Sequence, residues 1–62
     1  MTFAIFQKKA GSLDGGIYRD KDSKLFRVSI WYRGKTRIYN NYFLTYKNAR
    51  QALNRNIKKY SD

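Results

Sequence analysis

The residues of this chain that could do chemistry are arginines and lysines interleaved with aromatic side chains, most densely between Leu25 and Asn41. Within that stretch Arg27, Trp31 and Tyr39 each stand next to apolar residues. An Arg guanidinium can bond guanine O6 and N7 together, an Asn amide can pair with adenine, and a flat aromatic ring can contact sugars and thymine methyl groups. This mixture favours a surface that binds nucleic acid.

Catalytic and metal-binding chemistry has few suitable residues. The sequence contains neither His nor Cys, and its four carboxylates are Asp14, Asp20, Asp22 and Asp62. Asp20 and Asp22 share a turn, but lysines flank them in a segment too short to exclude water. Since imidazole and thiolate ligands are missing, we expect no metal site, no cofactor, no catalytic residue and no enzyme activity.

The composition indicates a small folded basic domain. The chain has 62 residues, with 14 Lys and Arg against 4 Asp and Glu, for a formal charge of +10. Hydrophobic residues make up 42% of it, which favours a folded domain over a disordered basic tail. Self-repulsion at this charge works against compaction, so a polyanionic partner is the simplest explanation. The candidates are nucleic acid, an anionic membrane and an acidic protein.

A membrane is the weakest of these partners. No apolar run approaches the ~20 residues that span a bilayer. The apolar opening Met1 to Phe6 is too short for a signal-peptide core and lacks a positive flank. We therefore expect no membrane partner and a cytoplasmic location.

Periodicity predicts strands followed by one helix. Strand-forming residues occupy 17–19, 25–32 and 36–41 or 42, with turn formers between them. After Thr45, a suitable N-cap, apolar residues recur at steps of three and four. That stripe is Tyr46, Ala49, Leu53, Ile57 and Tyr60. The predicted fold class is α+β, a three-stranded antiparallel β-sheet packed against one C-terminal α-helix (βββα).

The first 15 residues lie outside that unit. Met1 to Phe6 favours a strand by composition, and it could be an extra N-terminal edge strand or a loose arm. Lys8 to Gly16 is rich in Gly, Ser and Asp, which predicts a linker. We therefore divide the chain into an arm and linker over 1–15 and a βββα DNA-binding domain over 16–62.

Strand alternation assigns side chains to the two faces of the predicted sheet. The apolar set Phe26, Val28, Ile30 and Tyr32 belongs under the helix. The predicted open face is Arg27, Ser29, Trp31, Arg33, Arg37, Tyr39 and Asn41, with Tyr18 or Arg19 from the first strand. At the turns, Lys21, Lys24 and Lys35 can meet phosphates. Asn40 falls on the core side, which requires either an edge position or a β-bulge.

Other interpretations of this face stay open. Exposed arginines can be merely solvated, and Trp31 could cap a second small core with Met1 to Phe6, which could fold over the face. A basic inhibitor or adaptor that binds an acidic protein surface would have the same composition. RNA is less favoured than duplex DNA, because an RNA-binding sheet offers several neighbouring stacking aromatics.

Several short motifs add a family resemblance over about 45 residues, counted from Gly16 to Tyr60. They are Gly16-Ile17-Tyr18, Phe26-Arg27-Val28-Ser29-Ile30, Gly34-Lys35, Asn41-Tyr42-Phe43-Leu44-Thr45 and Ala49. With them the chain resembles the amino-terminal arm-binding domain of phage and transposon tyrosine integrases, and the related ethylene-response-factor type domain of plants. In those families a three-stranded sheet packs on a helix and lies in the DNA major groove. The resemblance implies groove-facing positions for Arg27, Ser29, Trp31, Arg37 and Tyr39.

The chain departs from the family pattern at two positions. Asn41 stands where a Gly is usual before the helix, and Asn48 where an acidic residue commonly precedes the helix alanine. The resemblance implies either an isolated integrase domain or a stand-alone phage-type protein, in a bacterium or a phage-infected host. We expect a monomer that binds double-stranded DNA.

Overall fold

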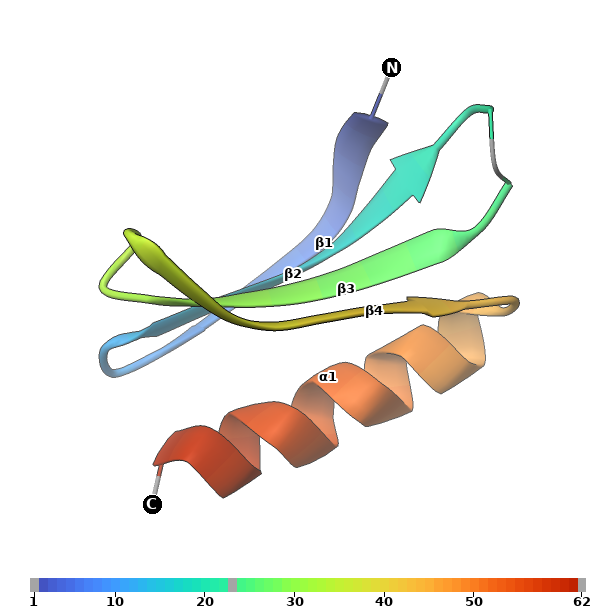
Figure 1. Cartoon of the computed structure of the whole chain (residues 1–62). Coiled ribbons are helices and arrows are strands. Elements are labelled where there is room, and N and C mark those ends of the chain that lie inside the picture. Colours follow the sequence, from blue (N-terminus) through green and yellow to red (C-terminus); the bar gives the residue numbers. More distant parts are fainter. Residues whose placement is uncertain (1, 23, 62) are drawn as a thin grey trace.

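The structure, a computed structural model, describes residues 2–22 and 24–61. Four strands form one antiparallel sheet, with a single helix packed across one face (Figure 1). In chain order the elements are β1 Thr2–Ala10, β2 Leu13–Asp20, β3 Phe26–Tyr32, β4 Thr36–Phe43 and α1 Tyr46–Ser61. The predicted α+β class and C-terminal helix are confirmed, and the sheet has a fourth strand at its N-terminal edge.

The N-terminal segment is an edge strand and not a loose arm. β1 pairs with β2 along its length, so it lies beside the sheet and does not fold over it. The prediction of a linker over Lys8 to Gly16 is wrong, because these residues complete both strands around the turn at Gly11 and Ser12. Gly11 has a φ of 60°, which glycine adopts without steric cost.

Helix α1 covers β2, β3 and β4 with the predicted stripe. Its buried residues are Ala49, Leu53 and Ile57, and the sheet contributes Leu13, Ile17, Val28 and Ile30 to the same core. The Thr45 hydroxyl accepts a hydrogen bond from the backbone N–H of Asn48 at 3.2 Å, which confirms the N-cap. Within the described residues, no helix is both long enough and apolar enough to span a bilayer.

Gly15 in β2 sets how closely the helix approaches the sheet. A Cβ added there would lie 2.7 Å from Leu53 Cδ1 and 2.8 Å from Ile57 Cδ1. Both side chains are buried in a packed core, so they cannot move aside freely. Gly16 faces the opposite side of the sheet, where a Cβ would lie 2.7 Å from the Tyr18 hydroxyl oxygen.

The two adjacent glycines give a matched test of this packing. We expect Gly15→Ala to lower the free energy of unfolding by about 1–3 kcal/mol, because it forces the helix away from the sheet. Gly16→Ala should cost less than about 1 kcal/mol, since the half-buried Tyr18 ring can turn into solvent. Both replacements change the unfolded chain in the same way. Urea denaturation measures the difference, and equal effects would contradict the close approach at Gly15.

Candidate nucleic-acid interface

The face of the sheet opposite α1 is called the open face here. Because Ile17 and Val28 are paired in the core, the alternate positions in β2 and β3 project to the other side. The strand register gives the open face these residues: Ala4, Gln7, Lys9, Asp14, Gly16, Tyr18, Asp20, Arg27, Ser29, Trp31, Arg37, Asn40 and Tyr42. Of the predicted residues, Arg27, Ser29, Trp31 and Arg37 lie on it.

Two arginines of the open face stack on aromatic rings of the neighbouring strand. Arg27 Cζ lies 5.3 Å from the centroid of the Tyr18 ring, and Arg37 Cζ lies 5.2 Å from that of Trp31. Arg27 Nε is buried without a hydrogen-bond partner, so the ring contact is what holds this guanidinium. These ring contacts leave the terminal N–H₂ groups of both guanidiniums without a hydrogen-bond partner among the described residues.

A β-bulge in β4 changes which side chains reach the open face. Arg37 pairs with Trp31, but Tyr39 pairs with Ile30, so Ile38 is an extra residue on its strand. Tyr39 therefore lies on the helix side, where it packs against the core. The prediction that Tyr39 belongs to the open face is wrong for this reason.

The same shift exchanges two asparagines. Asn41, predicted on the open face, pairs with Val28 on the helix side, and its Oδ1 accepts a hydrogen bond from the Tyr42 N–H. Asn40 takes its place on the open face, where its Oδ1 accepts a 3.1 Å hydrogen bond from the Ser29 hydroxyl. Of the two explanations left open for Asn40, the register supports the bulge.

The other predicted contacts lie on the helix side or at the sheet ends. Arg19 lies on the helix side with Cζ 4.5 Å from the Phe26 ring, so Tyr18 is the residue of that pair on the open face. Lys21 and Lys24 follow β2 at one end of the sheet. Arg33 and Lys35 lie at the opposite end, in the turn between β3 and β4, where Arg33 has a φ of 55° and Gly34 a φ of 69°.

Sequence reasoning missed the open-face residues of the first hairpin. Gln7 and Lys9 come from β1 and Asp14 from β2, all within or next to the segment predicted to be a linker. A signal was present in Gly11-Ser12, because a Gly-Ser pair between two strand-forming runs is typical of a two-residue hairpin turn. The bulge at Ile5 breaks the alternation of β1, so the pattern gave no reason to extend the expected strand beyond Phe6.

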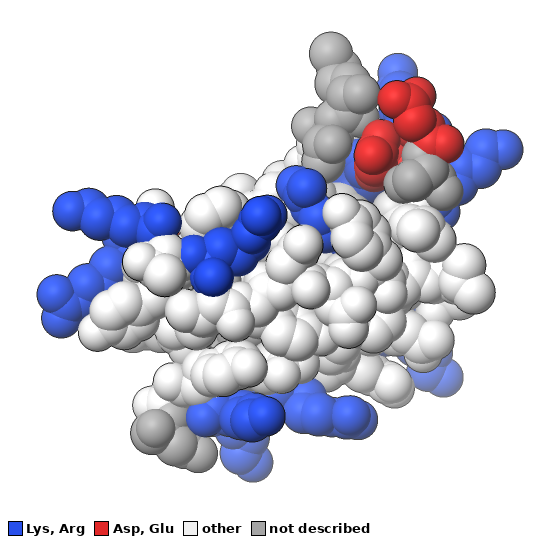
Figure 2. Space-filling view, in the orientation of Figure 1, with Lys and Arg blue, Asp and Glu red and all other residues white. Residues whose placement is uncertain are grey.

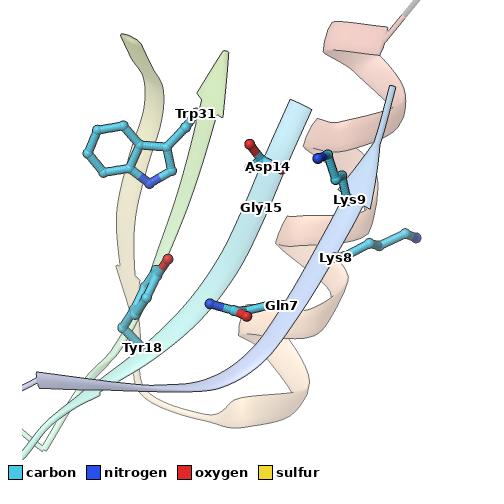
Figure 3. Close-up of a pocket in the computed structure, with 7 residues that line it drawn as sticks. All are labelled: Gln7, Lys8, Lys9, Asp14, Gly15, Tyr18 and Trp31. Atoms are coloured by element: carbon cyan, nitrogen blue, oxygen red, sulfur yellow. The ribbon is translucent and has the colours of Figure 1, made fainter. Parts of the chain in front are cut away.

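These residues surround a hollow of about 310 Å³ on the open face. In Figure 3 the side chains of Gln7, Asp14, Tyr18 and Trp31 gather around it above β2, while Lys8 points away. Lys8 Nζ instead donates a 3.1 Å hydrogen bond to Asn54 Oδ1 of α1.

Charge is unevenly distributed over the surface. In Figure 2 the acidic atoms in view gather near the loop between β2 and β3 with basic side chains beside them, and further basic side chains extend from the opposite end of the sheet and below α1. Asp20 Oδ1 accepts a hydrogen bond from the Asp22 N–H. Among residues 2–22 and 24–61, no Lys or Arg nitrogen lies within 4.0 Å of a carboxylate oxygen. The positive charge of the open face is thus not neutralised by ion pairs in the described part of the chain.

Searches against protein-family models, curated proteins and solved structures found no match. The resemblance to integrase arm-binding and ethylene-response-factor type domains stays a prediction from short motifs.

The bulge makes a prediction that separates the two faces of β4. Tyr39→Ala should lower the free energy of unfolding by about 1–2 kcal/mol, because a half-buried ring leaves the core. Arg37 lies two residues before Tyr39 and is exposed, so Arg37→Ala should lower the free energy of unfolding by less than about 1 kcal/mol. Thermal or urea denaturation of the two variants measures this. The reverse order of stabilities would contradict the register described here.

Proposed function

We propose that this protein binds double-stranded DNA with the open face of its sheet. The observation that carries the proposal is the pair of arginine–aromatic stacks, Arg27 on Tyr18 and Arg37 on Trp31. Each presents a positioned guanidinium that has no carboxylate partner among the described residues. A guanidinium in this state can bond a phosphate or the O6 and N7 atoms of guanine with two parallel hydrogen bonds.

The width of the sheet supports contact with the major groove. Neighbouring strands lie about 4.8 Å apart, so β2, β3 and β4 span about 10 Å between their outer axes. The major groove is about 12 Å wide and admits a two-stranded β-ribbon, which the pair β3 and β4, carrying Arg27 and Arg37, can supply. β1 would then lie over the adjacent sugar–phosphate backbone, where Lys9 can meet a phosphate.

The remaining basic residues fit the same placement. Arg33 and Lys35 at one end of the sheet and Lys21 and Lys24 at the other would contact phosphates, which fixes the register of the protein on the duplex. Tyr42 on the open face is 50% exposed and offers an apolar contact to sugars or thymine methyl groups. The motif resemblance favours the same mode of binding, with a monomer acting in the cytoplasm.

Salt dependence tests whether phosphates carry the affinity. If about six phosphates are neutralised, log affinity should fall against log salt concentration with a slope near −5. Fluorescence anisotropy of a labelled duplex between about 50 and 200 mM salt measures this slope. A slope near zero would remove DNA as the partner, because neutralisation of phosphates must release counterions.

Single charge deletions test which face carries the contacts. Arg27→Ala and Arg37→Ala should each weaken duplex binding by about 1 kcal/mol, or roughly fivefold, and bring the salt slope closer to zero by about one. Arg55→Ala on the exposed side of α1 is the matched control, since it removes the same charge from the other layer. Equal losses in all three variants would mean diffuse attraction and not a bound face. Amide NMR spectra check that each variant is folded.

One observation favours a second candidate function, that of a basic adaptor for an acidic protein segment. Beside Phe3 and Ile5 of β1 there is a second hollow of about 410 Å³, which Phe26 helps to line. Arg19, Lys21 and Lys24 line it as well. Phe3 is 45% exposed, so this hollow could accept an apolar side chain with carboxylates beside it. DNA binding that is weak and lost entirely at physiological salt would favour this function.

A further inference from the structure

The hollow between β1 and β3 on the open face has a chemistry that duplex contact does not use. It is concave, and its lining includes two aromatic rings, an amide, a carboxylate and an amine, from Tyr18, Trp31, Gln7, Asp14 and Lys9. In duplex DNA the edges of the base pairs lie at the floor of a groove. A hollow in the protein surface cannot reach them, because contact there requires a part of the protein that projects into the groove. A concave site fits a group that projects from a nucleic acid.

The rings of the hollow each contact neighbouring residues of the sheet. The Tyr18 ring lies across Gly16, where any Cβ would collide with it, and Arg27 stacks on the same ring. Trp31 is half-buried and has Arg37 stacked on it. Aromatic side chains of this kind bind unpaired bases by stacking.

Asp14 is the unusual member of the set. It is half-buried on the open face, beside Lys9 in the register, yet its carboxylate makes no ion pair and no hydrogen bond with the described residues. The Gln7 side chain likewise has no hydrogen-bond partner there. A carboxylate weakens attraction of phosphates to this face, so its position suits a ligand that brings N–H donors.

Guanine is the base whose donors match. Its Watson–Crick edge offers two adjacent donors, N1–H and N2–H₂, which one carboxylate can accept together, and an O6 acceptor for the Gln7 amide. Adenine and cytosine place a ring-nitrogen acceptor next to their amino group, which would face the Asp14 oxygens unfavourably. Thymine offers one N–H between two carbonyl groups. Because base pairing occupies this edge, the guanine must be unpaired.

We infer that this hollow binds an unpaired guanine base of a DNA strand. The base stacks on Trp31 beside Tyr18, Asp14 accepts from N1–H and N2–H₂, and Gln7 donates to O6. Lys9 and Arg37 lie where they can meet the flanking phosphates. This is a function beyond the contact with intact duplex proposed above, and it gives a role to the first hairpin.

Trp31 is the only tryptophan of the chain, so its fluorescence reports on the hollow directly. The probes are DNA hairpins of one sequence, either fully paired or carrying a single bulged G, A, C or T. We expect the bulged-G hairpin to quench Trp31 most and to bind about tenfold more tightly than the paired hairpin. Equal affinity for the paired and bulged-G hairpins would overturn the inference.

Asp14→Asn tests the role of the carboxylate, with Asp22→Asn as its control. Both replacements raise the net charge by one, but Asp22 lies in the exposed turn after β2. Asp14→Asn should reduce the preference for bulged G over bulged A to below about twofold, while Asp22→Asn keeps it. A preference that survives in Asp14→Asn would overturn the assignment of Asp14. Binding to the paired hairpin is measured in the same series, so failure of the duplex proposal would be seen separately.

Discussion

The contact of Leu53 and Ile57 with the backbone of Gly15 is the constraint from which the other features of the structure follow. It allows α1 to approach the sheet closely enough to bury Ile17, Val28 and Ile30. The described residues form one helix, and a helix covers only one face of a sheet. The second face must therefore be stabilised without a covering layer, and its residues reflect that requirement.

Side chains lying flat on the sheet form that second layer. The Tyr18 ring lies across Gly16, and the Arg27 guanidinium lies over the Tyr18 ring. On the same face the side chain of Ser29 is only 1% exposed. The Ser29 hydroxyl is satisfied by Asn40, so its burial does not leave an unpaired donor. The alternative in which Trp31 caps a core with the N-terminal segment does not fit, because β1 extends the sheet sideways. On this face the side chains that cover the backbone are thus the same ones that can contact a ligand.

The sequence predicted the helix and the central strand well because their signals are local. Thr45 caps α1 and the stripe through Leu53 fills the core, as the spacing indicates. The bulges at Ile5 and Ile38 have no such local signal, because a strand with one extra residue has the same kinds of residues as a regular strand. Each bulge nevertheless shifts every later side chain of its strand to the other face of the sheet. That shift is why Tyr39 and Asn41 were assigned to the open face. Asn40 indicated the problem, because a polar residue on the core side of an apolar strand requires an explanation.

The glycines of β2 were misassigned for a different reason. Gly15 and Gly16 resemble loop formers in sequence, yet at each a neighbour lies in the space that a Cβ would take: α1 on one face and Tyr18 on the other. This requirement is tertiary and cannot be derived from local propensity. It also links the two faces, because the same pair of residues allows the helix to pack and the Tyr18 ring to lie flat.

Charge connects this packing with binding. The formal charge of +10 is not offset by ion pairs within the described residues, so repulsion among like charges opposes the compact state. A ligand that binds only the folded chain stabilises it by mass action, and a polyanion also relieves that repulsion. The stacked arginines place part of this charge on the face that the helix leaves uncovered. The small core and the uncovered open face are therefore parts of one arrangement, in which a polyanionic partner would supply negative charge that the chain itself lacks.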